Sequence, residues 1–133
     1  MEKTMKGVTL IADWEPRPDF KLGYKDIDKK QTYLGSKVWK NPRIEIKEYP
    51  VPEPGPQEVL VEVKACGICG SDVHMAQPDK DGYILYPGLT GFPCILGHEM
   101  AGVVVKAGER AFDKRTNRPF KGGEYVCTEE MMW

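Results

Sequence analysis

The chain has 133 residues, with 19 Lys and Arg against 20 Asp and Glu, a formal net charge of −1, 4 cysteines and only 2 histidines. Its length suits one domain with a modest core, and its balanced charge argues against a nucleic-acid binder that works through a general positive field. No apolar run approaches the roughly 20 residues that span a bilayer, so we expect neither nucleic acid nor membrane as a partner.

The first half of the chain contains two segments with the pattern of β-strands. Residues 7–12 (GVTLIA) are mostly apolar, and residues 43–49 (RIEIKEY) alternate between apolar and charged side chains, which predicts a half-buried strand. Residues 14–36, between them, show no sustained period. We interpret this stretch as an irregular surface excursion with one helical turn.

The second half predicts three further strands. Prolines 50, 52, 54 and 56 indicate an extended connector with little freedom. The strand that follows, residues 58–65 (EVLVEVKA), has the clearest pattern in the chain, with Val59, Val61 and Val63 on one face. Two more strands are expected at 100–106 and 124–128, with long loops at 78–93 and 108–119.

These elements favour a mainly β fold. The 14 glycines and 11 prolines are typical of short strands joined by turns, and little helix is predicted, so a small barrel or sandwich is favoured over a βαβ fold. Neither a G-x-G-x-x-G run after a strand nor a P-loop occurs in the chain, so no nucleotide-binding domain is visible in it.

The ends and the cysteines bear on cellular context. The first ten residues carry no signal-peptide pattern, and four cysteines without an export signal indicate a reducing compartment such as the cytoplasm, where metal binding is favoured over disulfides. The chain stops on the apolar run Met131-Met132-Trp133. Because natural termini are more often polar, we expect the sequence to be part of a longer protein.

Both histidines lie in two short segments, CGICGSDVH at 66–74 and GHE at 97–99. The first segment starts where the strand at 58–65 ends, and Ser71 or Asp72 is predicted to cap a short helix. A cysteine just before such a helix lies at the positive end of its dipole. We expect this position to lower the pKa of the thiol and to favour the thiolate that metals bind.

A thiolate, an imidazole and one further donor make a catalytic zinc site with one open position. Cys69 and His98 are the candidates for the first two donors, and Cys69 is favoured over Cys66. Glu99 adjoins His98 and either approaches the metal or sets its charge. Asp72 is the nearest candidate for the carboxylate that commonly holds the second nitrogen of a histidine ligand.

Ser71 and His74 supply a hydroxyl and an imidazole close together in the chain. Together they make a plausible path for a proton from a buried alcohol to solvent. Cys94 and Cys127 are interpreted as ordinary small buried residues.

Other interpretations stay open at this point. The C-x-x-C pair at 66–69 also fits half of a zinc ribbon, but the chain has no second C-x-x-C. It fits a redox pair as well, but the βαβ context of such a pair is missing. A lone histidine is commonly a hydrogen-bonded structural residue. Spacing alone does not decide between a metal site and a structural domain.

The run CGICGSDVH followed by GHE, after the strand VLVEVKA, resembles zinc-dependent medium-chain alcohol and polyol dehydrogenases. The likeness is greatest to the branch of sorbitol, threonine and inosose dehydrogenases, and it extends from about residue 43 to 128. The segment FKGGEYV at 120–126 resembles the family's F-x-x-G-D-x-V turn, with Glu124 in place of the usual aspartate.

This resemblance implies a GroES-like, partly open β-barrel with short helices over residues 1–133, with an irregular insertion at about 14–36. Such a domain is normally joined to a Rossmann domain that binds NAD or NADP. The resemblance makes Cys69 and His98 zinc ligands, Asp72 the partner of His98, and Glu99 the acid beside the metal. The third ligand and the cofactor domain are expected beyond Trp133, so this part alone should be inactive.

The implied activity is oxidation of a secondary alcohol of a polyol, sugar or cyclitol, with zinc as Lewis acid and hydride transfer to the nicotinamide. Ser71 would take the proton of the substrate and His74 would pass it outward. Gly70 stands where some relatives carry a basic residue near the cofactor phosphates. The segment GYILYPGLTGFP at 82–93 resembles enzymes assigned to scyllo-inosose or related cyclitols, and the relatives are homodimers or homotetramers.

Two alternatives remain beside this hypothesis. One is a metal-free GroES-like module with a structural or interaction role, and the other is a zinc-free relative of the quinone reductases. Cys69, His98 and the cluster at 71–74 argue against both, because a purely structural barrel has little use for these residues together.

Overall fold

The computed structural model describes residues 3–30 and 32–128, which fall into two compact units. Unit 1 takes in the described parts of Met1–Met5, Pro50–Ile68 and Gly97–Trp133, and unit 2 takes in Lys6–Tyr49 and Cys69–Leu96. The apolar end at Met131–Trp133 lies outside the described residues.

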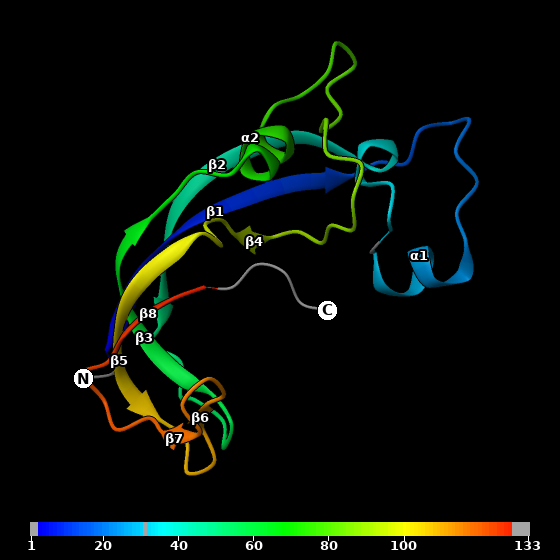
Figure 1. Ribbon diagram of the computed structural model, residues 1–133. Helices are drawn as coiled ribbons and strands as arrows, with labels where there is room; N and C mark the ends of the chain where they lie inside the picture. The colour runs from blue at the N-terminus through cyan, green and yellow to red at the C-terminus, as the bar shows by residue number, and fades with distance from the viewer. Residues whose placement is uncertain (1–2, 31, 129–133) are drawn as a thin grey trace. The chain divides into compact units, whose positions relative to one another are not determined.

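Strands dominate both units (Figure 1). The strands are β1 Thr4–Trp14, β2 Trp39–Pro50, β3 Val59–Cys66, β4 Cys94–Ile95, β5 Met100–Ala107, β6 Phe112–Asp113, β7 Arg118–Pro119 and β8 Tyr125–Cys127. The helices are α1 Tyr24–Lys29 and α2 Gly70–Ala76, with a 3₁₀ turn at Gly35–Lys37.

The mainly β fold class expected from the sequence is confirmed. The described strands form three separate sheets, in the orders β2-β1-β4, β3-β5-β8 and β6-β7. They are open sheets and do not close into a continuous barrel within the described residues, in line with the partly open barrel of the GroES-like fold. No helix of the described residues is long and apolar enough to cross a bilayer.

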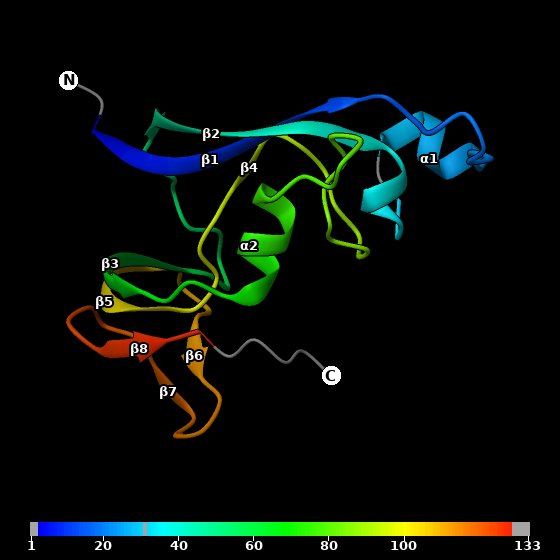
Figure 2. The same ribbon diagram turned by 90° about the horizontal axis from the view of Figure 1, so that it is seen from above.

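Unit 2 is built on the β2-β1-β4 sheet, and α2 lies on one face of that sheet (Figure 2). Leu10 of β1 pairs with Cys94 of β4, and the Leu10 side chain is completely buried. The core continues at Val38, Trp39 and Ile84. Because the Trp39 ring makes edge contacts with both Trp14 and Phe92, at 4.9 Å between ring centroids, aromatic packing holds the loop at 78–93 against the start of β2.

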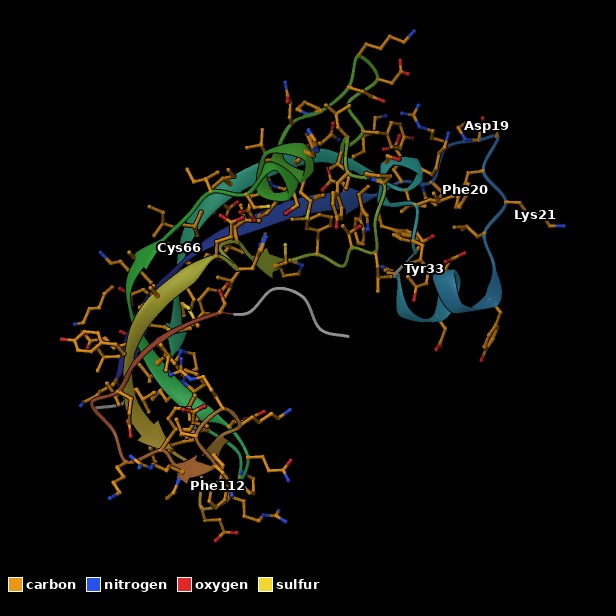
Figure 3. All side chains as sticks on the ribbon, in the orientation of Figure 1. Asp19, Phe20, Lys21, Tyr33, Cys66 and Phe112 are labelled. Atoms are coloured by element: carbon orange, nitrogen blue, oxygen red, sulfur yellow. The ribbon has the colours of Figure 1, made fainter. Side chains whose placement is uncertain are left out.

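The irregular excursion at 14–36 is confirmed, and α1 and the 3₁₀ turn are its only helical parts among the described residues. It is anchored at its base, where the backbone N–H of Arg17 donates to the carbonyl of Lys37 over 2.8 Å. Phe20 packs against the core of unit 2, whereas Lys21 points away from it (Figure 3). The excursion therefore belongs to the packing of unit 2.

Unit 1 is built on the β3-β5-β8 sheet. β3 pairs antiparallel with β5 from Val59↔Ala107 to Cys66↔Met100, and β5 pairs with β8 at its own beginning. The loop expected at 108–119 is wrong in part, because two two-residue strands, β6 and β7, form a hairpin there. Its turn is closed by Asp113, whose carboxylate accepts from the backbone N–H of Arg115 over 2.9 Å.

Several burial expectations are wrong. The alternation in β2 predicted a half-buried strand, yet Ile44 and Ile46 are 54% and 73% exposed, because the described residues leave that face uncovered. Cys127 is exposed, and Cys94 is only half-buried. Alternation identifies the apolar face of a strand, but what covers that face depends on residues far away in the chain.

The loop at 78–93 carries a partly buried ion pair between Asp79 and Arg17. The Asp79 carboxylate accepts from the backbone N–H groups of Asp81 and Tyr83, both over 2.9 Å, and pairs with the Arg17 guanidinium. Burial pulls the pKa of Asp79 upward, but these two amides and Arg17 outweigh it, so the pKa lies below its ordinary value. Asp79 is therefore ionised wherever the protein is folded near neutral pH.

We predict that Tyr49→Phe lowers the free energy of unfolding by about 1 kcal/mol. The Tyr49 hydroxyl lies 2.7 Å from the hydroxyl of Thr9, which is completely buried, so the substitution removes the shorter of the two hydrogen bonds of that hydroxyl and leaves the one to the carbonyl of Gly7. Denaturant unfolding measures the change. Tyr125→Phe is the control, because Tyr125 is 87% exposed, and an equal loss in both variants would contradict the prediction.

We predict that Asp79→Asn destabilises the protein near neutral pH and that its deficit shrinks on acidification. A carboxylate whose pKa is lower in the folded state stabilises that state above its unfolded pKa, and this contribution is lost as pH falls through the lowered pKa of the folded state. Unfolding free energies of wild type and variant at several pH values test this. A deficit that stays constant with pH, like that expected for the exposed control Asp19→Asn, would refute it.

Candidate active site

In unit 2, the segment CGICGSDVH ends in helix α2. Cys69 occupies the N-cap with extended backbone angles (φ −82°, ψ 153°), and the Asp72 carboxylate accepts from the Cys69 N–H over 3.1 Å. Neither Ser71 nor Asp72 is the N-cap residue, because the helix already begins at Gly70, but Asp72 caps the helix from its third position through this bond. The cysteine nevertheless stands directly before the helix, as predicted.

The polar residues of α2 differ in their exposure. Asp72 is buried, at 6% exposure, whereas Ser71 is half-buried and His74 is exposed. Since residues three apart in a helix lie on the same side, Ser71 and His74 form a graded polar path from the interior of unit 2 to its surface. This order of burial suits a hydroxyl and an imidazole that pass a proton outward.

Cys94 lies in the electrostatic field of Asp72. Burial raises the pKa of the Cys94 thiol, and the negative charge of Asp72 raises it further. Cys94 is therefore a neutral thiol near neutral pH, which makes it a poor nucleophile and a poor metal donor.

In unit 1, the motif GHE leads into β5, and hydrogen bonds hold its backbone from two sides. The Gly67 N–H donates to the carbonyl of Glu99 over 2.7 Å, and the Thr128 hydroxyl donates to the carbonyl of His98 over 2.6 Å. The Thr128 hydroxyl also accepts from the N–H of Met100 over 3.1 Å. His98 is exposed and Glu99 is half-buried on this fixed backbone.

Two glycines allow the end of β3 and the GHE motif to pack closely against each other. A Cβ on Gly67 would lie 2.7 Å from a carboxylate oxygen of Glu99, and a Cβ on Gly97 would lie 2.7 Å from the Cys66 sulfur. Gly97 also has a φ of +96°, a conformation that side chains disfavour. A side chain at Gly67 would displace the Glu99 carboxylate, and a side chain at Gly97 would strain the backbone and crowd the Cys66 sulfur.

An open cavity of about 260 Å³ lies beside this motif in unit 1. Cys66, Glu99, Cys127 and Thr128 are among the residues that line it. Nothing in the sequence around Cys127 and Thr128 points to a site, because no local pattern shows that β8 ends beside the start of β5. Cys66 marks the end of β3 in Figure 3.

The structure thus places the candidate residues in two groups. Cys69, Gly70, Ser71, Asp72 and His74 stand together on α2 of unit 2, and His98 and Glu99 stand together before β5 of unit 1. All four cysteines are free thiols, which leaves Cys69 available as a donor. A thiolate, an imidazole and a carboxylate fit zinc, whereas magnesium and calcium prefer oxygen ligands alone.

The chain is similar in sequence to several proteins named as dehydrogenases. The chain is 62% identical, over 130 residues that make up 97% of this chain and 33% of the relative, to scyllo-inosose 3-dehydrogenase of Thermotoga maritima. It is 46% identical over 65 residues, 49% of this chain and 17% of the relative, to sorbitol dehydrogenase of Bos taurus.

A solved structure described as an alcohol dehydrogenase of Thermotoga maritima matches with a TM-score of 0.89 and 61% identity, over 96% of this chain and 33% of that one. The chain therefore spans about a third of the length of this structure and of the scyllo-inosose relative. Residues 55–132, more than half of the chain, match the family described as alcohol dehydrogenase GroES-like domain. The chain belongs to this family.

Proposed function

We propose that the chain is the N-terminal catalytic-domain portion of a zinc-dependent, NAD- or NADP-linked dehydrogenase. The enzyme oxidises a secondary alcohol of a polyol, sugar or cyclitol to a ketone. The observation that carries this proposal is the 62% identity, over 97% of the chain, to a protein named scyllo-inosose 3-dehydrogenase. The sorbitol dehydrogenases among the relatives support a polyhydroxy alcohol as the substrate class.

Cys69 and His98 are proposed as zinc ligands, with Glu99 as a third acidic group toward the metal. The fold of unit 1 supports this choice, because the Gly67 N–H is bonded to the carbonyl of Glu99. Cys69 follows Gly67 by two residues, and a trans peptide chain spans at most about 7 Å over that distance. Asp72 is proposed as the carboxylate that orients His98.

When bound, zinc supplies Lewis acidity that makes a substrate alcohol more acidic. The half-buried hydroxyl of Ser71 accepts the proton of the alcohol as it gives its own proton to the exposed imidazole of His74, three residues further along α2, and the imidazole releases that proton to solvent. Gly70 has no atom within 4 Å of the place where its Cβ would be, so the first turn of α2 leaves room for a cofactor phosphate. A bound nicotinamide would supply the acceptor for the hydride.

The function is tested with the purified full-length protein, scyllo-inosose and sorbitol as probes, and NAD and NADP as acceptors. Reduction of either cofactor in the presence of one probe supports the proposal, and a wider panel of polyols and cyclitols follows. If no polyol in the panel reduces either cofactor, the metal-free module becomes the better account. The cytoplasmic location and the homo-oligomer stay predictions.

We predict that Cys69→Ala and His98→Ala each remove most of the catalytic zinc, because each deletes one of its protein ligands. Elemental analysis of the full-length protein measures zinc per chain without relying on activity. Cys127→Ala is the matched control, since it removes an exposed thiol of β8. Zinc content that is unchanged in the Cys69 and His98 variants would refute this ligand assignment.

We predict that Gly67→Ala weakens zinc binding about tenfold, the effect typical of disturbing the groups that orient a metal ligand. The new methyl group would lie 2.7 Å from a Glu99 carboxylate oxygen and must displace it. Competition with a chelator gives the affinity. Gly70→Ala, which meets no atom within 4 Å, should bind zinc like wild type, and equal affinities in both variants would contradict a role for Glu99.

A further inference from the structure

The Arg17 side chain, in the excursion at 14–36, joins three parts of unit 2. Its guanidinium pairs with Asp79 and with Asp81, the latter over 3.3 Å, and it lies over the Tyr83 ring at 3.9 Å from the ring centroid. Its Nε donates to the carbonyl of Ser36 over 3.3 Å. With a side chain only 20% exposed, Arg17 is more constrained than a solvated surface ion pair.

The partners of Arg17 belong to a tight turn directly after α2. The Asp79 N–H donates to the carbonyl of Tyr83 over 2.7 Å, and the Gly82 N–H donates back to the carbonyl of Asp79 over 3.0 Å. A β-bridge between Pro78 and Ile84 closes the base of the turn. The hairpin also pairs with β2, where the Asn41 N–H donates to the carbonyl of Gly82 over 2.8 Å and the Ile84 N–H donates to the carbonyl of Trp39 over 3.1 Å. Arg17 adds a side-chain clamp on the two aspartates of the turn.

This hairpin is bonded to the C-terminal end of α2. The N–H of Leu85, the first residue after the bridge, donates to the carbonyl of His74 over 3.0 Å and to that of Gln77 over 3.2 Å. These are carbonyls of the last helical turn, which lack a partner further along the helix. The position of the hairpin therefore sets the position of the helical turn that carries His74.

We propose that Arg17 is a positioning residue for His74: by clamping the hairpin at 78–84 it holds the last turn of α2, and the imidazole on it, in the place where the proton leaves Ser71. This inference rests on the proposed function, in which His74 releases that proton. It gives the excursion at 14–36 a role in the reaction without any contact of its own with substrate.

Arginine is specifically suited to this clamp. A lysine reaches one carboxylate as a point charge, whereas the planar guanidinium bonds two carboxylates and stacks on a ring at once. Arg17→Lys should therefore retain only part of the kcat that Arg17→Ala loses. Arg43 supplies a matched control, because its guanidinium also pairs with an aspartate over 3.0 Å, but at a side-chain exposure of 49% and with Asp13 of β1, which is not a residue of the hairpin.

The test uses the full-length holoenzyme and a double-mutant cycle between Arg17→Ala and His74→Asn. Arg17→Ala is expected to lower kcat about ten- to a hundredfold with KM nearly unchanged, since misplacing an acid–base group by about 1 Å has such an effect. Arg17→Lys should lie between this variant and wild type, and Arg43→Ala should match wild type. In the His74→Asn background, Arg17→Ala should cost less than about twofold.

Amide hydrogen exchange gives a second measurement that does not depend on turnover. Arg17→Ala should accelerate exchange at the Leu85 N–H, while the core amides of β1 keep their protection and show that the fold is intact. If Leu85 exchanges as in wild type, or if the losses of Arg17→Ala and His74→Asn multiply, Arg17 does not act through His74 and the proposal is overturned. A wild-type enzyme that oxidises no polyol overturns the proposed function itself.

Discussion

The antiparallel pairing of β3 with β5 is the constraint on which the candidate site depends. It runs to Cys66↔Met100 and is continued by the bond from the Gly67 N–H to the carbonyl of Glu99. Cys69 follows Gly67 by two residues, and His98 directly precedes Glu99. The β3–β5 hydrogen bonds therefore restrict the positions at which the motifs CGICGSDVH and GHE begin. Glycine at 67 lets the carboxylate of Glu99 lie against the backbone. Unit 1 thereby supplies a rigid platform, as a metal site requires.

Unit 2 carries the residues proposed to move a proton, and its packing explains why it carries so long an excursion. The aromatic contacts of Trp39 hold the loop at 78–93 on one side, and Arg17 holds the hairpin after α2 on the other. A seven-residue helix is too short to be stable alone, so its place comes from these tertiary contacts. Buried Asp72 at its start and the bonded carbonyl of His74 at its end then orient the polar residues between them.

Much of this arrangement could be predicted from the sequence, and the exceptions have physical reasons. Strong alternation located β3 and β5 to within two residues, and the two motifs identified the candidate donors. The strands β4, β6 and β7 have only two residues each, which is too short for an alternation of apolar and polar residues to reveal them in the sequence. The N-cap was placed wrongly, because serine and aspartate are commoner caps than cysteine. Contacts between distant residues, such as the Thr128 hydroxyl on the carbonyl of His98, leave no local pattern.

The central claim is that Cys69 and His98 bind one zinc ion in the complete enzyme. Anomalous diffraction at the zinc edge from crystals of the full-length protein tests it most directly. The account predicts a zinc peak about 2.3 Å from the Cys69 sulfur and about 2.0–2.1 Å from a nitrogen of His98. A fully occupied zinc elsewhere, with no peak at these two side chains, would contradict it.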